Sequence, residues 1–162
     1  MRPRGGKRVQ CFGGAKNHMI IMPDANMDQA VDVLMGAGYG SAGERCMAIS
    51  VAVPVGKETA DRLIEKLIPR VETLKIGPST DPSADFGPLV TKAHLDKVKA
   101  YVDIGVKEGA SLKVDGRNFK LQGYEDGFYM GGCLFDNVTE DMRIYKRGDL
   151  RTRPLGPARS DL

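Results

Sequence analysis

The 162-residue sequence lacks any apolar run approaching the ~20 residues that a membrane-spanning helix needs. Its N-terminus also lacks the apolar stretch of a signal peptide. Hydrophobic residues make up 41% and charged residues 28% of the chain, which is typical of a folded soluble domain and not of a disordered or fibrous protein. We therefore expect one cytoplasmic domain with its own core and no membrane partner.

Cysteine and histidine are scarce as well. The three cysteines, Cys11, Cys46 and Cys133, are odd in number and widely spaced, which argues against a disulfide framework and against a metal site. The two histidines, His18 and His94, have no cysteine or carboxylate neighbours at the spacing of metal ligands. We expect reduced thiols and no bound metal.

The middle of the chain has no excess of basic residues, although the formal net charge is +3. Residues 1–8 carry +4 and residues 147–162 carry +2, so the segment between them carries −3. A nucleic-acid-binding protein would need a basic face on its folded body. The charge distribution therefore predicts no nucleic-acid partner.

Hydrophobic periodicity predicts strands that alternate with helices. The first helix begins at Asn26, whose side chain can cap it with Gln29 three residues later, and it ends in a run of glycines. Pro69 should kink or break the second helix near its end, and Gly109 should stop the third. The predicted strands are 8–12, 18–22, 48–55, 112–114 and 128–134, and the other helical segments are 60–74 and 95–106. This order predicts an α/β layered fold with a mostly parallel sheet.

The glycines at 38, 40 and 43 have the spacing G-x-G-x-x-G of a dinucleotide-binding turn. That fingerprint follows a strand and opens a helix, whereas this run follows a predicted helix. We therefore interpret residues 38–43 as a loop that depends on glycine geometry and not as a nucleotide site.

Cys46 lies between this loop and a strand of small residues, in Gly-Glu-Arg-Cys-Met-Ala at 43–48. A thiol at such a place can be partly exposed while its backbone is held, which suits a nucleophile. The alternative is a small buried hydrophobe, which is the commoner state of a free cysteine. Glu44 and Arg45 do not decide between the two, because neighbours in sequence need not face the thiol.

Several longer motifs carry a resemblance to a known family. They are Gly-Gly-Ala-Lys-Asn-His at 13–18, Pro-Asp-Ala at 23–25, Gly-Glu-Arg-Cys-Met at 43–47 and Gly-Pro-Leu-Val-Thr at 87–91. Together they resemble the aldehyde dehydrogenases, and among these the CoA-acylating methylmalonate-semialdehyde dehydrogenases, from about residue 5 to residue 146. The resemblance implies an incomplete aldehyde dehydrogenase catalytic-domain fold, with the superfamily's nucleophile at Cys46.

The resemblance also implies a reaction. A thiolate adds to the aldehyde, a hydride passes to NAD and a thioester remains on the enzyme. Hydrolytic relatives activate water with a glutamate just before the paired glycines, and that position is Cys11 here. A cysteine cannot act as that base, so the resemblance implies transfer of the acyl group to CoA. The implied substrate is methylmalonate or malonate semialdehyde, and the implied products are CO₂ with propionyl-CoA or acetyl-CoA.

The chain departs from the family at both ends. Family members are far longer and homo-oligomeric, and the resemblance implies that residues 1–146 are part of the catalytic domain without most of the NAD-binding domain. After residue 146 the family continues Glu-Glu-Ile-Phe-Gly-Pro, whereas residues 147–155 read Arg-Gly-Asp-Leu-Arg-Thr-Arg-Pro-Leu. One extra base before the family's codons yields this sequence, so we expect 147–162 to be an out-of-frame, disordered tail.

Two functions are consistent with these features. The first is a catalytic fragment that keeps Cys46 but turns over no aldehyde by itself, because tight NAD and CoA binding would need the rest of the family's sequence. The second is a non-catalytic module that associates with an intact paralogue or with a separately encoded NAD-binding domain. Co-purification would distinguish the second from the first.

Overall fold

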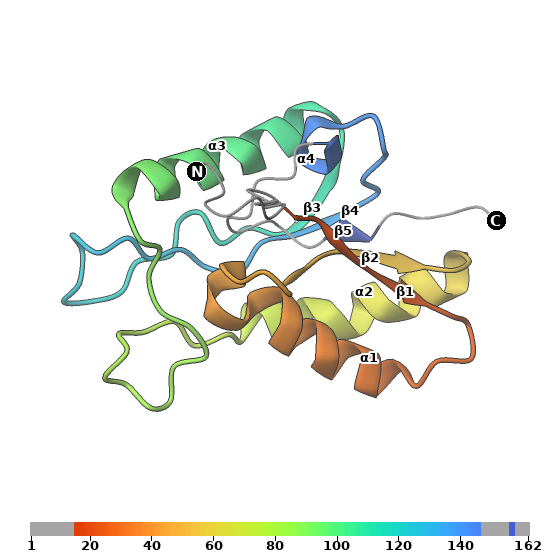
Figure 1. Ribbon diagram of the computed structural model, residues 1–162, viewed down its shortest axis with the longest axis horizontal. Helices are drawn as coiled ribbons and strands as arrows, with labels where there is room; N and C mark the ends of the chain where they lie inside the picture. The colour runs from red at the N-terminus through yellow and green to blue at the C-terminus, as the bar shows by residue number, and fades with distance from the viewer. Residues whose placement is uncertain (1–14, 147–155, 158–162) are drawn as a thin grey trace, which may run out of the picture.

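The computed structural model describes residues 15–146 and 156–157, which form layers (Figure 1). Helices α1 (Met27–Leu34) and α2 (Lys57–Glu72) lie on one side of the strands. Helix α3 (Lys92–Lys107) lies on the other side, next to the short α4 (Arg143–Lys146). The expected α/β layered fold is confirmed.

One sheet is parallel throughout. Strands β1 (Asn17–Ile21), β2 (Ile49–Pro54) and β5 (Gly156–Pro157) pair in the order β1-β2-β5. β1 and β2 match the predicted strands at 18–22 and 48–55 to within one residue at each end. A parallel pair needs a long crossover connection, which α1 and the turns after it supply.

The first helix begins where its cap was predicted. Asn26 Oδ1 accepts a hydrogen bond of 3.2 Å from the backbone N–H of Gln29, which satisfies one of the free donors of the first turn. After Leu34 the chain continues through a π-helical turn, η1 (Met35–Tyr39), and a 3₁₀ turn, η2 (Gly40–Gly43). The glycine run therefore ends α1, as expected.

Helix α2 buries one face and runs through its proline. Leu63, Leu67 and Val71 are at most 2% exposed, at the spacing of one helical face. Pro69 lies inside the last turn, and the helix continues to residue 72. Pro69 therefore does not break α2. It leaves the carbonyl oxygen of Glu65 without its helical donor, but the Thr73 N–H still donates to the Pro69 carbonyl oxygen at 3.2 Å and closes the last turn.

A second, smaller sheet follows α3. The helix ends with Glu108 as its cap, and Gly109 has φ of +94°, as suits the predicted stop. Strand β3 (Ser111–Val114) then pairs antiparallel with β4 (Leu134–Asp136). The prediction of a mostly parallel sheet therefore holds for β1, β2 and β5, and β3 with β4 form a separate ribbon.

The predicted strand at 128–134 is wrong for residues 128–133, because β4 begins at Leu134. In this segment the backbone N–H of Gly131 donates to the carbonyl oxygen of Gly116 at 2.9 Å. The two backbones approach so closely that a Cβ at Gly116 would overlap Gly131. Burial explains the apolar run that suggested a strand, since Met130 and Cys133 are buried without belonging to one.

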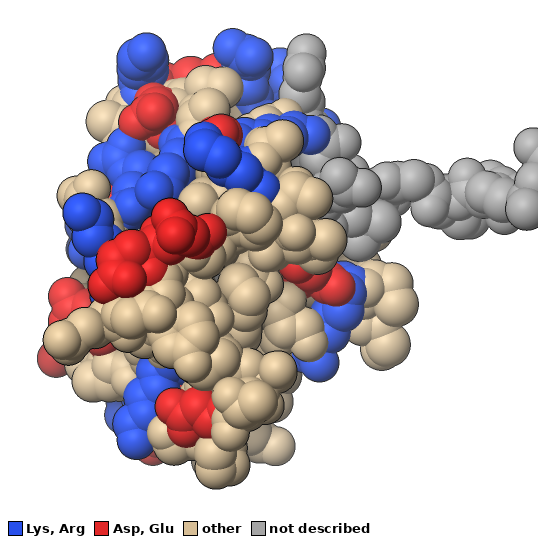
Figure 2. Space-filling view, turned by 90° about the vertical axis from the view of Figure 1, so that its left-hand side faces the viewer, with Lys and Arg blue, Asp and Glu red and all other residues tan. Residues whose placement is uncertain are grey.

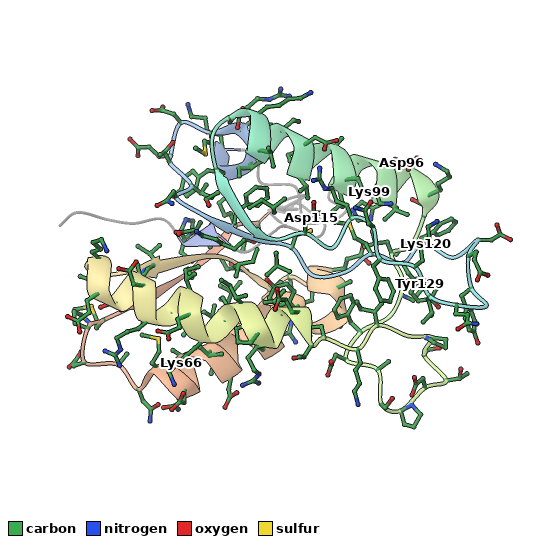
Figure 3. All side chains as sticks on the ribbon, turned by 180° about the vertical axis from the view of Figure 1, so that it is seen from behind. Lys66, Asp96, Lys99, Asp115, Lys120 and Tyr129 are labelled. Carbon is green, nitrogen blue, oxygen red and sulfur yellow. The ribbon has the colours of Figure 1, made fainter. Side chains whose placement is uncertain are left out.

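The core consists of two clusters that meet at β4. One lies between the parallel sheet and the helices α1 and α2, and the other lies between α3 and the ribbon of β3 and β4. Leu134 belongs to the first cluster and Phe135 to the second, and both are fully buried. In Figure 3, Tyr129 lies between α3, which carries Lys99, and α2, which carries Lys66. Alternate strand residues point to opposite faces, so β4 serves both clusters.

Three predictions fall on residues outside the described part. The strand at 8–12 and Cys11 lie there, and so does most of 147–162. Within 147–162 the structure describes Gly156–Pro157, which pairs with β2 as β5. The out-of-frame tail therefore stays a prediction.

Charged side chains of both signs are mixed over the face shown in Figure 2, with uncharged surface between them. Exposed ion pairs join α2 to α1, namely Lys66 with Asp28 at 2.6 Å and Arg70 with Asp32 at 2.8 Å. Such pairs contribute little to stability in water. Among the described residues, no helix has both the length and the apolar character that a membrane crossing requires.

We predict that Gly105→Ala destabilises the chain by about 1–3 kcal/mol, the usual cost of overpacking a core. A Cβ at Gly105 would lie 2.8 Å from Phe135 Cζ and 3.0 Å from Ile144 Cδ1. Gly36→Ala is the matched control, because a Cβ there meets nothing within 4 Å. Urea unfolding followed by circular dichroism measures both variants. Equal stability of the two would contradict the packing described here.

Candidate active site

The turn before Cys46 has an unusual backbone. Ser41 and Ala42 have φ of 54° and 52°, and Gly43 has φ of 71°. These are left-handed conformations, which cost a residue with a Cβ roughly 1–2 kcal/mol each. The glycine-dependent geometry predicted for residues 38–43 holds only at Gly43, because Gly40 has a negative φ and the other two left-handed positions are Ser41 and Ala42. Contacts elsewhere in the turn must therefore hold it in place.

Cys46 is exposed, and its backbone is held by a side chain of β1. The thiol stands in the turn that leads into β2. Asn17 of β1 donates from its side-chain Nδ2 to the carbonyl oxygens of Cys46 and of Ala48, each at 2.9 Å. An exposed thiol on a fixed backbone is the arrangement that a nucleophile requires.

The two charged residues before Cys46 each bond to a different element. Arg45 Nη2 donates to the carbonyl oxygen of Gly36 in η1 at 2.7 Å. Glu44 Oε1 lies 2.9 Å from His94 Nδ1, in the first turn of α3. The side chains of His94 and Glu44 are only 5% and 19% exposed. The turn is therefore joined to β1, η1 and α3.

Cys133 is in a different state. It is 5% exposed, and burial raises the pKa of its thiol to about 11. Its Sγ accepts a hydrogen bond from the backbone N–H of Gly116 at 3.3 Å, and its carbonyl oxygen accepts one from the Tyr39 hydroxyl at 3.0 Å. Burial also raises the pKa of Tyr39. Cys133 is thus a protonated core residue beside an apolar cavity of about 50 Å³.

Reasoning from the sequence did not find Asn17 or His94 as site residues. Asn17 belongs to the motif at 13–18, but its role depends on a hydrogen bond to the turn at Cys46, 29 positions further along the chain. His94 showed no partner at metal-ligand spacing, because its carboxylate, Glu44, lies in a different part of the sequence. Only the polar character of a residue on an otherwise apolar helix face could have indicated it.

Neither a pyrophosphate-binding turn nor a cluster of metal ligands is present among the described residues. The glycine run at 38–43 follows α1 and η1 and does not open a helix after a strand, so it lacks the geometry of a pyrophosphate site. No group of three or more metal-ligating side chains gathers anywhere in residues 15–146. The chemistry available here is that of the thiol.

Most of the chain is similar to one known protein family and to known proteins within it. A model of the aldehyde dehydrogenase family matches residues 2–148. Malonate-semialdehyde dehydrogenase of Pseudomonas aeruginosa is 60% identical over 141 residues, which are 87% of this chain and 28% of that protein. The mitochondrial methylmalonate-semialdehyde/malonate-semialdehyde dehydrogenase [acylating] of Rattus norvegicus is 45% identical over 143 residues, or 88% of this chain and 26% of that one.

A solved structure extends the comparison to the fold. It is a crystal structure of a Sinorhizobium meliloti protein assigned as a methylmalonate-semialdehyde dehydrogenase and complexed with NAD. It superposes with a TM-score of 0.90 at 64% identity, over 96% of this chain and 32% of that one. The chain thus spans less than a third of the length of these relatives. The resemblance in the motifs is confirmed, and the chain belongs to the aldehyde dehydrogenase family.

Proposed function

We propose that Cys46 is the nucleophile of an NAD-dependent, CoA-acylating dehydrogenase for malonate or methylmalonate semialdehyde. The observation that carries the proposal is the exposed thiol of Cys46 on a backbone that Asn17 holds through the carbonyl oxygens of Cys46 and Ala48. The relatives from P. aeruginosa and R. norvegicus, named for these substrates, support the choice of aldehyde.

The first step uses residues of this chain. The Cys46 thiolate attacks the aldehyde carbon, so a C–S bond forms and the carbonyl oxygen takes the electron pair as an alkoxide. The backbone N–H of Cys46 donates to that oxygen and stabilises its charge. Oxidation of this adduct to a thioester needs a hydride acceptor, a role that the family resemblance assigns to NAD.

The second half of the reaction is transfer of the acyl group. The position of the water-activating glutamate is occupied by Cys11, which lies outside the described residues. A cysteine there does not supply the carboxylate that activates water, so the thioester persists until the thiol of CoA attacks its carbonyl carbon and releases Cys46. The C–C bond to the substrate's carboxylate breaks to release CO₂, its electron pair passes to the carbon next to the thioester carbonyl as an enolate, and a proton from water completes the acetyl or propionyl group. The rat relative, whose name includes "acylating", supports this outcome.

The alternative is a module that works by association. Ile20 is 67% exposed on β1, which is the edge of the described parallel sheet, and Met22 just beyond it is 52% exposed. An edge strand with apolar side chains favours pairing with another chain. The partner would be an intact paralogue or a separately encoded NAD-binding domain, and affinity purification of the tagged chain from its host tests for it.

We predict that the purified 162-residue chain forms no NADH from NAD, CoA and malonate semialdehyde. The reason is that the chain spans only 28% of the length of the P. aeruginosa relative, and its glycine run at 38–43 lacks the geometry of a pyrophosphate site. Absorbance of NADH is the measurement, with the P. aeruginosa relative as positive control. Sustained NADH formation that Cys46→Ser abolishes would show that the chain is a complete enzyme.

We predict that a chimera is active and depends on Cys46. In it, the matching 141 residues of the P. aeruginosa enzyme are replaced by those of this chain, which are 60% identical. Cys46→Ser should lower the rate of NADH formation by at least ~10³-fold, because a hydroxyl is a far weaker nucleophile than a thiolate. Cys133→Ser is the matched control and should retain most of the rate. Acetate in place of acetyl-CoA as product would contradict the acyl transfer.

We predict that iodoacetamide modifies Cys46 at least ~100-fold faster than Cys133 at neutral pH. The thiolate is the reacting form, and burial that raises the Cys133 pKa to about 11 keeps that thiol protonated until the solution approaches this pH. Peptide mass spectrometry after timed quenching gives both rates. Comparable rates in the folded chain would show that Cys133 is not the buried residue described here.

A further inference from the structure

We propose that His94 is a positioning residue for Cys46, acting through Glu44. The imidazole binds the Glu44 carboxylate against α3 and so keeps this negative charge from the thiolate two residues further on. This inference rests on the proposed role of Cys46 as nucleophile.

The contact between the two side chains is short and shielded from water. Glu44 Oε1 and His94 Nδ1 are 2.9 Å apart, with the imidazole 5% and the carboxylate 19% exposed. A carboxylate oxygen can only accept from an N–H, so Nδ1 carries the proton in this pair. A charge-assisted hydrogen bond out of water is stronger than a neutral one.

Both partners are also fixed through their backbones. The backbone N–H of His94 donates to Thr91 Oγ1 at 3.2 Å, which places the imidazole in the capped first turn of α3. The backbone N–H of Glu44 donates to the carbonyl oxygen of Ser41 at 2.9 Å, within the left-handed turn. The pair therefore joins a rigid helix to the turn that carries Cys46.

The second ring nitrogen of His94 indicates that the imidazole does more than fill space in the core. His94 Nε2 is buried and has no hydrogen-bond partner among the described residues. Leaving a buried polar atom unpaired costs free energy, which a leucine at this position would avoid. The arrangement is explained if the bond from Nδ1 to Glu44 is what the residue supplies.

The bond between His94 and Glu44 affects the thiol because Glu44 carries a negative charge. The thiolate is the reactive form of cysteine, and a carboxylate nearby favours the protonated thiol instead. Glu44 is two residues before Cys46, and when it loses its partner in α3 its carboxylate is free to turn toward the loop. The guanidinium of Arg45 is already engaged elsewhere, since its Nη2 donates to the carbonyl oxygen of Gly36 in η1.

The test is a double-mutant cycle on the rate of Cys46 alkylation by iodoacetamide at neutral pH, in the 162-residue chain. We expect His94→Leu to slow the reaction by roughly 3- to 10-fold, as a like charge near a thiolate does. In a Glu44→Gln background the same substitution should change the rate less than about twofold. A residue that only fills space would slow both backgrounds equally, and that result would overturn the proposal.

Two polar variants keep the test decisive if His94→Leu does not fold. The amide nitrogen of asparagine takes the place of Nδ1, whereas that of glutamine takes the place of Nε2. We expect His94→Asn to retain most of the wild-type alkylation rate and His94→Gln to lose it. Equal rates in these two variants would contradict the proposal.

Asp96→Asn is the matched control, since it removes an exposed carboxylate from the same helix, where Asp96 pairs with Lys92 at 2.6 Å (Figure 3). It should leave the alkylation rate unchanged. Failure of the chimera to form NADH would refute the proposed dehydrogenase function and would leave the cycle intact. If the effects of the His94 and Glu44 substitutions on the alkylation rate are independent of one another, only the role of His94 is refuted.

Discussion

The side-chain amide of Asn17 is the contact on which the geometry around Cys46 depends. Its two bonds, to the carbonyl oxygens of Cys46 and Ala48, connect residues 29 and 31 positions apart in the sequence. They form only when β1 and β2 pair in the observed register, in which Asn17 is opposite Ile49. A slip of that register would move the amide away from the turn. The fold and the candidate active site therefore share one constraint.

The turn that carries the thiol keeps an unfavourable backbone because three elements restrain it. Ser41 and Ala42 adopt left-handed conformations that side chains normally avoid. Bonds from Asn17, from Arg45 and to His94 tie the residues that follow to β1, η1 and α3. Left-handed residues with side chains persist where several contacts hold the backbone in place, and such positions are common at functional sites.

Local features of the fold could be predicted from the sequence. Each of these features depends on residues only a few positions apart. They are the cap at Asn26, the stop at Gly109 and the ends of β1 and β2. The strand predicted at 128–134 failed, because its apolar residues are buried by long-range packing without pairing as a strand. Periodicity reports burial, and it identifies a strand only where a partner strand is present.

The site was predictable only in part, for the same reason. The motifs indicated Cys46 through a resemblance, whereas its sequence neighbours alone did not separate a nucleophile from a small buried hydrophobe. Exposure does separate them, and exposure follows from tertiary packing. The bond between Glu44 and His94 joins two segments that no local pattern connects. Contacts of this kind become visible only when the chain is folded.

The sharing of β4 between two cores has a consequence for how the chain unfolds. Leu134 and Phe135 are adjacent and fully buried, yet each belongs to a different hydrophobic cluster. Withdrawing this strand opens both clusters at once, so neither half keeps its interior when the other is lost. We therefore expect the two clusters to unfold together, because they share the three residues of β4.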